Sequence, residues 1–439
     1  MSETLISVGL DVGTTSTQMI LSELVIENRA GSFAVPELEI ESRRILYKSP
    51  VHLTPLLQDE LVDGDALRRI VDAEYAAAGI PKKDVGTGAI IITGETSRKE
   101  NARAVLHALS DFAGDVVVAT AGPDLESVLA AKGAGAVEHS AKTGKTVLHM
   151  DIGGGTSNLA LIEDGKITAT SCLNIGGRLL KIAPDGRLTY VSPVLDGLFS
   201  KQVGDYVNQR GVLELARTLV QALEMAAGLR EGAELLHKLV TREAGSLEAP
   251  SNVVLSFSGG VADCIETQQP WLAFGDLGPE LGLAIRESRL CQGEYILGQE
   301  TIRATVIGAG CHSAQLSGST VFHQNVDFPL KNLPVVESVD ALTRLDGPGV
   351  LVVPGEAMDF AGIRDLAKNL TASIKAPVYV ATSGDMAKAL GQALALRLGT
   401  DVKILCIDRV RLKEGDYLDV GAPIGPALPV VVKTLIFNR

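Results

Sequence analysis

The chain has 439 residues, of which 46% are hydrophobic and 21% charged, so it is long enough for two or three domains with substantial cores. Aromatic residues are sparse, at 4%, and 46 residues are glycine, a composition that favours an α/β protein whose strands are buried on both faces. The formal net charge of −13 argues against a broad nucleic-acid or anionic-membrane surface.

The first 145 residues are expected to form one subdomain. Residues 5–24 read as a strand, a glycine turn and a second strand, and residues 65–79 as a helix with Leu67, Ile70 and Val71 on one face. Two further strand–helix units are predicted in residues 88–112 and in residues 115–136. The polar stretch 139–146 then marks a domain junction.

A second subdomain is expected from residue 146 to 303. It opens with another strand and glycine loop, and the turns Asp164–Gly165 and Asp185–Gly186 predict hairpins that continue the sheet. A long helix is predicted within residues 211–229, followed by a third strand–glycine–helix turn in residues 252–265.

The remaining chain is expected in two parts. Residues 304–339 begin with a connecting helix, rich in small residues that permit close backbone approach, and are predicted to return to the first subdomain. Residues 340–439 alternate strand and helix and predict a separate C-terminal α/β unit.

Two loops combine an acidic residue with glycines and hydroxyl side chains. Glycine allows backbone angles at which successive N–H groups converge on an anion, and hydroxyls add donors to phosphate oxygens. An acid beside a phosphate requires a cation between them, and Mg²⁺ binds one or two carboxylates together with substrate phosphates. The predicted phosphate–metal residues are Asp11, Gly13, Thr14 and Thr15 in the first loop, and Asp151, Gly153, Gly154, Gly155, Thr156 and Ser157 in the second.

Each loop has a simpler interpretation. Either loop alone could be a plain hairpin turn, although a hairpin rarely needs three glycines and two such loops in one chain make that interpretation weak. A third turn, at Ser258 with Gly259 and Gly260, could let the backbone lie against the sugar or base of a nucleotide. It could equally be a strand–helix turn with a glycine cap.

These motifs resemble a known superfamily. "LDVGTTST", "MDIGGGTSNLAL", "VVLSFSGGVAD" and "ATVIGAGCHSA" follow one another as the first phosphate motif, the second phosphate motif, the adenosine motif and the second connection do in the actin, hexokinase and heat-shock-chaperone ATPases. The resemblance covers residues 5–320. It implies an actin-like ATPase fold, in which two RNase-H-like domains bind ATP and Mg²⁺ in a cleft, with Asp11 and Asp151 holding the metal.

A closer resemblance runs nearly end to end. "IIITGETSRKENARAVLHAL", "AGPDLESVLAAKGAGA", "HMDIGGGTSN" and "GDYLDVGAPIGPALPVVVKTLIFN" are similar to the reactivating factors of ethanolamine ammonia-lyase. This family implies a chaperone with weak ATPase activity. Its members use ATP and Mg²⁺ to release damaged cobalamin from the adenosylcobalamin-dependent lyase, so that intact coenzyme binds. The implied partner is that lyase, and the implied location is the cytoplasm or a bacterial microcompartment.

The residue that activates water is not fixed by these motifs. Glu126 lies 25 positions before Asp151, where the related exopolyphosphatases carry a glutamate, and it completes an expected catalytic set of Asp11, Glu126 and Asp151. Glu95 is a second candidate. Both have the alternative role of an acid near a helix N-terminus, where the helix dipole favours negative charge. A short basic cluster after Glu95 reads as a solvated helix face or as a contact to γ-phosphate; its members are Arg98, Lys99 and Arg103.

Other features favour no further chemistry. The five cysteines have no CxxC spacing, so a zinc knuckle or disulfide framework is not indicated and a reduced cytosol is expected. His149 is expected to be a core residue rather than a catalytic one. No apolar run reaches the roughly 20 residues of a membrane helix, and no basic region precedes the first apolar stretch as in a signal peptide.

Two other classes of function stay open at this point. One is a small-molecule kinase or phosphatase of the same superfamily, although no pattern for a base aimed at an acceptor hydroxyl stands out. The other is a filament-forming or scaffold protein, which requires a self-complementary surface that a single sequence does not display. A homo-oligomer is equally open.

Overall fold

The computed structural model describes most of the chain. The described residues are 3–13, 16–28, 38–57, 61–93, 117–120, 123–241, 253–298, 300–312, 314–316, 321–345, 347–355, 358–374, 376–410, 412, 414, 416–421, 423 and 428–434. In these ranges no helix is long and apolar enough to cross a membrane.

The first lobe is built on a sheet with the strand order β3-β2-β1-β7-β8. Its strands are β1 (Glu3–Val12), β2 (Ser16–Asn28), β3 (Leu38–Lys48), β7 (Val85–Ile92) and β8 (Val117–Thr120), and the short β4 (His52–Leu53) also pairs with β2. The first three strands are antiparallel, whereas β7 and β8 run parallel to β1.

The second lobe repeats this arrangement. Its sheet has the order β11-β10-β9-β14-β15. The strands are β9 (Val147–Ile152), β10 (Ser157–Glu163), β11 (Lys166–Leu173), β14 (Val254–Ser258) and β15 (Tyr295–Leu297). Again three antiparallel strands are followed by two strands parallel to the first. Two sheets with one order and one set of directions form the actin-like ATPase fold.

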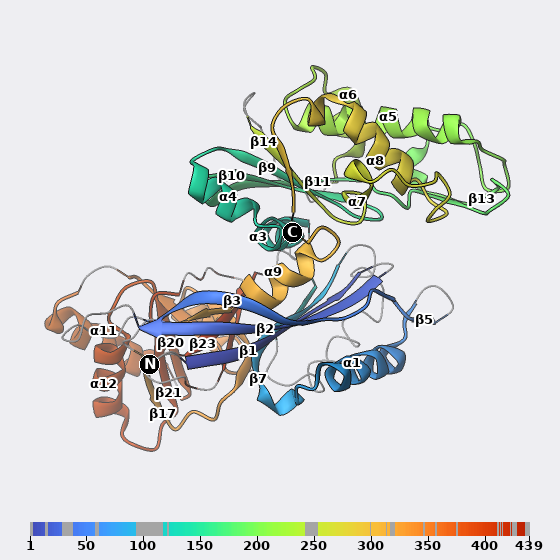
Figure 1. The fold of residues 1–439 in the computed structure, drawn as a ribbon. Coiled ribbons are helices and arrows are strands. Elements are labelled where there is room, and N and C mark those ends of the chain that lie inside the picture. The colour runs from blue at the N-terminus through green and yellow to red at the C-terminus, as the bar shows by residue number, and fades with distance from the viewer. Residues whose placement is uncertain are drawn as a thin grey trace.

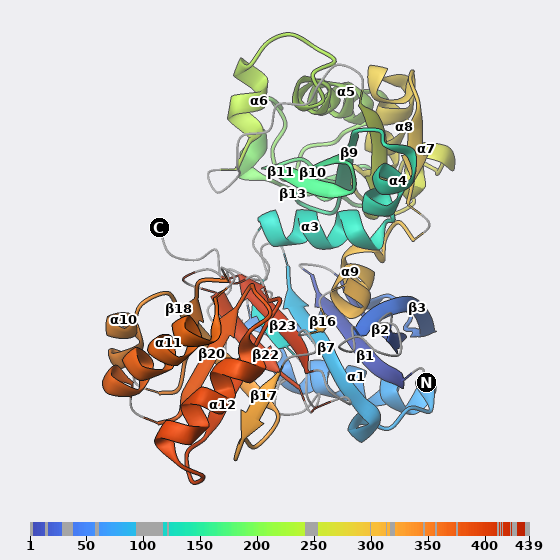
Figure 2. The same cartoon turned by 90° about the vertical axis from the view of Figure 1, so that its left-hand side faces the viewer.

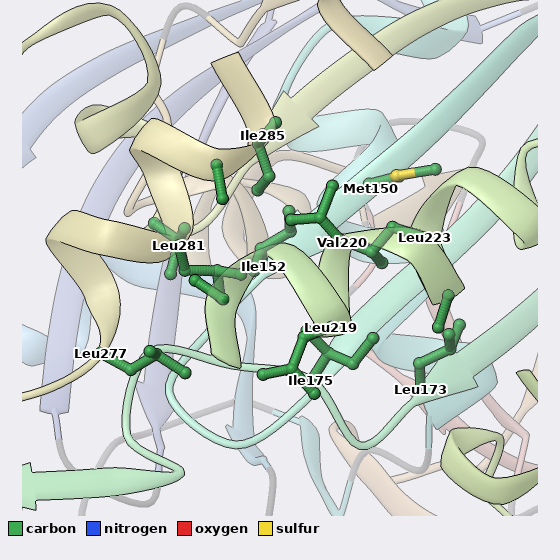
Figure 3. Close-up of a cluster of buried hydrophobic side chains, with 14 of the residues drawn as sticks. Met150, Ile152, Leu173, Ile175, Leu219, Val220, Leu223, Leu277, Leu281 and Ile285 are labelled. Carbon is green, nitrogen blue, oxygen red and sulfur yellow. The ribbon is translucent and has the colours of Figure 1, made fainter. Parts of the chain in front are cut away.

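Helices α5 (Gln209–Ala226) and α8 (Gly278–Glu287) cover one face of the second sheet. Leu219 and Leu223 of α5 and Leu281 of α8 are completely buried and face the strands, as Figure 3 shows. The apolar residues of α5 recur at intervals of three and four, which places them on one side of the helix. The opposite face of this sheet packs on α4 (Ala136–Thr143), through Ala136 among others.

In the first lobe, α1 (Gly64–Ala78) and α9 (Ala304–His312) lie on opposite faces of the sheet. Leu10 and Val12 of β1 pack with Leu67 of α1, whereas Ile20 of β2 packs with Val306 of α9. The strand side chains alternate between the two faces, so this sheet is buried on both sides.

The two lobes meet where α9 crosses α3 (Pro123–Gly133), in the middle of Figures 1 and 2. The helices touch through glycine: a Cβ at Gly133 would lie 1.9 Å from the carbonyl oxygen of Ala304, and one at Gly308 would lie 2.1 Å from that of Leu129. The close backbone approach expected from the small residues of this helix is confirmed.

The C-terminal unit has an eight-stranded sheet in the order β16-β23-β22-β18-β19-β20-β21-β17 and lies beside the first lobe (Figure 2). Its strands are β16 (Ala314–Leu316), β17 (Phe322–Gln324), β18 (Leu330–Val336), β19 (Val350–Val353), β20 (Val378–Thr382), β21 (Ile404–Ile407), β22 (Asp416–Val420) and β23 (Pro429–Thr434). Its helices are α10 (Val339–Thr343), α11 (Phe360–Ser373) and α12 (Ala387–Leu398).

This sheet changes the expected division of the chain. Residues 304–339 were expected to return to the first subdomain, and within them α9 packs on the first sheet and β16 contacts β3. Strands β16, β17 and β18 belong to the eight-stranded sheet, so this unit starts before the expected boundary at residue 340. The reason is that the sheet which a strand joins depends on contacts with distant segments, and a local apolar pattern does not indicate those contacts.

Several shorter elements complete the described chain. They are β5 (Leu56–Leu57), β6 (Leu61–Val62), β12 (Leu180–Ile182), β13 (Leu188–Val191), α6 (Glu234–Leu239) and α7 (Asp263–Glu266). The hairpin at Asp164–Gly165 joins β10 to β11 with positive φ at both residues, as predicted. The hairpin at Asp185–Gly186 forms too, but as a separate two-stranded sheet rather than a continuation of the main one.

Candidate functional site

Two aspartates end equivalent strands in the two lobes. Asp11 lies near the end of β1 and accepts a hydrogen bond from the Thr93 hydroxyl at 2.9 Å. Burial raises the pKa of Asp11 to about 7; the Thr93 bond opposes this rise and the charge of Asp151 adds to it. Asp151 lies near the end of β9 and accepts a hydrogen bond from the Ser258 hydroxyl. Burial raises the pKa of Asp151 to about 6, against the effect of that bond.

A buried polar chain supports Asp151 from the next strand. The two ring nitrogens of His149 lie 2.9 Å from the hydroxyl oxygens of Ser256 and Ser258. Burial lowers the pKa of His149 to about 3, so the ring is neutral at physiological pH. His149 is therefore the hydrogen-bonded core residue that the sequence favoured, and its ring holds the serine that contacts Asp151.

The two glycine loops are closed by equivalent backbone hydrogen bonds. The Gly13 N–H donates to the Ser16 carbonyl at 2.9 Å, and the Gly153 N–H donates to the Thr156 carbonyl at the same distance. In the first loop, the Thr54 hydroxyl also donates to the Gly13 carbonyl at 2.7 Å. Thr14 and Thr15 lie outside the described residues. In the second loop, the Ser157 hydroxyl donates to the Ile175 carbonyl at 2.8 Å, so it is used within the fold.

The second loop presents two N–H groups on one side. The carbonyls of Gly153 and Gly154 accept hydrogen bonds from the N–H groups of Gly177 and Arg178, at 3.0 and 2.6 Å. In a trans peptide the C=O and the following N–H point in opposite directions, so the N–H groups of Gly154 and Gly155 face away from residues 177–178. Within the described chain neither N–H donates a hydrogen bond. Adjacent free donors of this kind suit an anion.

The reason for the three glycines differs from the one expected. None of Gly153, Gly154 and Gly155 has φ in the left-handed region, so the expectation of otherwise forbidden angles is wrong here. Strict glycine positions lie beside the loop instead. A Cβ at Gly176 would lie 2.4 Å from the Gly154 carbonyl oxygen, and Gly259 has a φ of +86° with a Cβ position 2.3 Å from the Ile152 carbonyl oxygen. These two glycines allow neighbouring backbone to hold the loop.

The third turn is joined directly to the second loop. The Gly259 N–H donates to the Thr301 carbonyl at 2.9 Å, and the Val261 N–H donates to the Ile152 carbonyl at 3.2 Å. Gly260 is exposed, and a Cβ at this position would have the Ile302 side chain as its nearest neighbour, at 3.8 Å. The turn therefore places an open backbone position beside the end of β9.

Glu126 reaches the same site from the first turn of α3. Its side chain is buried, with 7% of its surface exposed, and its Oε2 accepts a hydrogen bond from the Asn158 Nδ2 at 2.7 Å. Asn158 lies directly opposite Asp151 in the β9–β10 pair. The structure thus brings Glu126 to Asn158, the cross-strand neighbour of the second aspartate. Glu95 and the basic residues Arg98, Lys99 and Arg103 lie outside the described residues.

Sequence reasoning missed the amides of this site. Gln18 lies directly opposite Asp11 in the β1–β2 pair, as Asn158 lies opposite Asp151. The shared spacing of seven residues from acid to amide, in both loops, was a signal that could have found them. Thr93 and Gly176 carry no local signal, because their contacts to the site come from distant parts of the chain. Ser258 was recognised as part of the third turn, but its hydrogen bond to Asp151 was not predicted.

The donor set fits a hydrated divalent cation. No three side chains of His, Cys, Asp or Glu gather as a metal cage in the described ranges. Mg²⁺ needs no such cage, since it keeps several waters and binds through one or two carboxylates and the phosphates of a substrate. Two carboxylates and two buried amide oxygens without hydrogen-bond partners, on Gln18 and Asn158, are of the type that accepts hydrogen bonds from those waters.

Comparisons with known proteins agree over nearly the whole chain. A family model described as ethanolamine utilisation protein EutA matches residues 3–346 and 349–438. The chain is 38% identical over 470 residues to the ethanolamine ammonia-lyase reactivase EutA of Salmonella typhimurium strain LT2, with 99% of this chain and 98% of that protein covered. It is 37% identical over 462 residues to the protein of the same name from Escherichia coli strain K12, with the same coverage. Among solved structures, the Aquifex aeolicus PPX-GPPA enzyme covers 70% of this chain and 99% of its own, with 11% identity and a TM-score of 0.42.

Proposed function

The chain belongs to the family of ethanolamine utilisation protein EutA, and we propose that it is an ATP-dependent reactivase of ethanolamine ammonia-lyase. In this proposal the protein binds Mg-ATP between its two lobes and helps the inactivated lyase to exchange damaged cobalamin for intact adenosylcobalamin. Its partner is the lyase, and its location is that of the lyase, in the cytoplasm or in a bacterial microcompartment.

The observation that carries the nucleotide part is the pair of equivalent acid–glycine loops. In the second loop, the N–H groups of Gly154 and Gly155 are free to bind phosphate oxygens. Asp11 and Asp151 have raised pKa values, so each must lose its proton to hold a cation. Magnesium, when bound, would neutralise charge on the phosphates and on these two carboxylates. Thr156 and the first-loop hydroxyls are proposed as further phosphate contacts.

Hydrolysis is assigned to Glu126. Its carboxylate is held by Asn158 beside the Asp151 strand, which supports the proposal that it accepts a proton from a water attacking the terminal phosphate. The buried setting excludes bulk water from around this carboxylate. Slow hydrolysis suits a chaperone, because the bound state must last long enough for the partner to respond.

The coupling to the partner follows from the two-lobed arrangement. A ligand shifts a conformational equilibrium only by its different affinities for the two states. A triphosphate that contacts both loops favours the arrangement in which the lobes are close, and its hydrolysis product does so less. The lobes are joined at the α3–α9 crossing, and Glu126 lies on α3. A change in lobe angle would alter any surface that spans the lobes and thereby its grip on the lyase.

The match over the C-terminal unit favours this function over a small-molecule kinase or phosphatase. Both curated relatives cover 99% of this chain, including the eight-stranded unit that follows the two lobes. A kinase built only on the two lobes would not need that unit.

The test is reactivation of lyase that has been inactivated with hydroxocobalamin. The purified chain is added with Mg-ATP and fresh adenosylcobalamin, and lyase activity and released cobalamin are followed together. We expect recovery with Mg-ATP and none with ADP, with EDTA or with the Asp151→Asn variant. Absence of recovery and of cobalamin release under all conditions would refute the proposal.

A further inference from the structure

The two lobes place a side-chain amide at the same position relative to each aspartate. Gln18 pairs with Asp11 across β1 and β2, and Asn158 pairs with Asp151 across β9 and β10. Residues directly opposite on antiparallel strands point to the same face, with Cβ atoms about 5 Å apart. Each amide therefore lies beside the carboxylate of its own lobe.

The orientation of both amides is fixed by their partners. The Gln18 Nε2 donates to the Ile302 carbonyl oxygen at 3.1 Å, and the Asn158 Nδ2 donates to the Glu126 carboxylate at 2.7 Å. Both partners are acceptors, so the nitrogen of each amide must face them and the oxygen must face the other way.

Both amide oxygens lack a donor. Gln18 and Asn158 each have 4% of their surface exposed, and the Gln18 Oε1 and Asn158 Oδ1 atoms are buried without a hydrogen-bond partner in the described structure. A buried acceptor without a donor is unfavourable, and such atoms are rare in folded proteins. Two of them at equivalent positions indicate that the donors come from a ligand.

The chemistry of these oxygens selects the ligand. A phosphate oxygen cannot serve, because it is itself an acceptor. Water donates, and water bound to a divalent cation donates strongly because the cation withdraws electron density from its O–H bonds. We propose that Gln18 and Asn158 are a matched pair of positioning residues, whose amide oxygens accept hydrogen bonds from the waters around Mg²⁺ held between Asp11 and Asp151. This inference rests on the proposed Mg-nucleotide site.

Through their amide nitrogens, Gln18 and Asn158 are also hydrogen-bonded to two different elements. Asn158 links its water to Glu126, the proposed base. Gln18 links its water to Ile302, next to Thr301, whose carbonyl holds Gly259 of the third turn. On the side of the second lobe, Asn158 therefore connects the waters around the cation to Glu126. On the side of the first lobe, Gln18 connects them to the segment that leads into α9.

The experiment measures the magnesium enhancement, defined as the ratio of the Kd of AMP-PNP in EDTA to its Kd in Mg²⁺, by calorimetry on the full chain. Gln18→Met and Asn158→Leu remove both the oxygen and the N–H donor. Gln18→Glu and Asn158→Asp keep an oxygen acceptor but also lose the donor. We expect the enhancement to fall about tenfold in each apolar variant, the lower end of the effect of outer-shell metal partners, and to persist in the acidic variants.

The acidic variants separate this role from a structural one. If the amides served only to hold Ile302 and Glu126 through their N–H groups, the apolar and acidic variants would be equally defective, and the inference would be refuted. Gln324→Met is the matched control, because the Gln324 amide donates to the carbonyls of Gly399 and Val402 in the C-terminal unit; it should leave the enhancement unchanged.

The failure of this inference differs from the failure of the proposed site. A wild-type chain without any magnesium enhancement would refute the metal site and the inference with it. A wild-type enhancement that both apolar variants retain would refute the inference alone. Thermal unfolding of each variant shows whether it is folded, and if one position does not tolerate change, the other decides the outcome.

Discussion

The negative charge of Asp151, in the second lobe, raises the pKa of Asp11, in the first lobe. The charge of one lobe therefore acts on the carboxyl of the other, although 140 positions separate the two residues in the sequence. Burial makes the larger contribution to both raised pKa values. Because a protonated carboxyl must lose its proton before it binds a cation, protons and a cation compete at this site. Four predictions follow from that competition and from the contacts around the site.

The first prediction concerns pH and stability without nucleotide. The folded pKa values of Asp11 and Asp151 lie above the ordinary aspartate value of 3.8, so their contribution to stability is present below pH 4 and is lost as the pH rises through about 6 and 7. The double variant Asp11→Asn, Asp151→Asn avoids this loss. Its free energy of unfolding should therefore exceed that of the wild type increasingly from pH 4 to pH 7, and by a constant amount above. Chemical unfolding at several pH values measures the difference; parallel curves would contradict the prediction.

The second prediction concerns the response of the same residues to Mg-ATP. At a hundredfold excess over Kd, a ligand that binds only the folded state stabilises it by about 2.7 kcal/mol. The rise in melting temperature with Mg-ATP should grow from pH 5 to pH 8 as the two carboxyls ionise, and it should vanish in either single asparagine variant. Asp185→Asn, in an exposed hairpin turn, is the control and should respond as the wild type does. A full response from Asp151→Asn would exclude that residue from the site.

The third prediction concerns Glu126 as the base. Glu126→Gln keeps an oxygen that accepts from Asn158, so AMP-PNP should bind with unchanged Kd. Loss of a positioned general base should lower the ATPase rate about 100-fold or more. Asp124→Asn is a close control, because Asp124 lies in the same turn of α3 but is held by Thr170. Equal ATPase rates for Glu126→Gln and Asp124→Asn would dismiss Glu126 as the base.

The fourth prediction separates two kinds of glycine. Gly176→Ala and Gly259→Ala force a Cβ into backbone atoms at 2.4 and 2.3 Å, so each should destabilise the fold by about 2 kcal/mol or more. A Cβ at Gly154 would lie 3.6 Å from the nearest atoms, which belong to the Arg178 side chain, and Gly154→Val needs no left-handed φ. It should therefore fold normally and lose nucleotide binding, because the branched side chain crowds the two free N–H groups.

Unfolding curves and AMP-PNP titrations on the same three variants measure both effects. A Gly154→Val chain as unstable as Gly259→Ala would show that the loop glycines are required by the fold instead. Unchanged nucleotide affinity in a folded Gly154→Val chain would mean that these N–H groups do not bind phosphate.

Local sequence was enough to predict most of the elements. The helix expected at residues 65–79 is α1, and of the three residues expected on its apolar face Leu67 and Val71 are in the core whereas Ile70 is only half-buried. The Asp164–Gly165 turn forms the predicted hairpin, because aspartate and glycine both adopt positive φ more readily than most residues. Signals of this kind lie within a few residues of one another, so one sequence contains them completely.

The same holds for the two acid–glycine loops. An acid near the end of a strand followed by glycine can be recognised directly in the sequence, and both loops are closed by an equivalent backbone hydrogen bond. The positions that strictly require glycine could not be predicted in the same way. They are Gly176, more than twenty positions after the second loop, and Gly259, about a hundred positions after it, where a Cβ would meet the backbone of Gly154 and of Ile152.

What the sequence alone determined is therefore the set of elements, the two loops and their acids, since each depends on local backbone preference and periodicity. Only the tertiary structure decided that Gln18 and Asn158 face the aspartates, that Asn158 holds Glu126, and that β16, β17 and β18 belong to the C-terminal sheet. These relationships arise from strand register and from packing between distant segments. Such contacts form only when the burial of the whole chain outweighs the entropy of closing long loops, and no short stretch of sequence contains that balance.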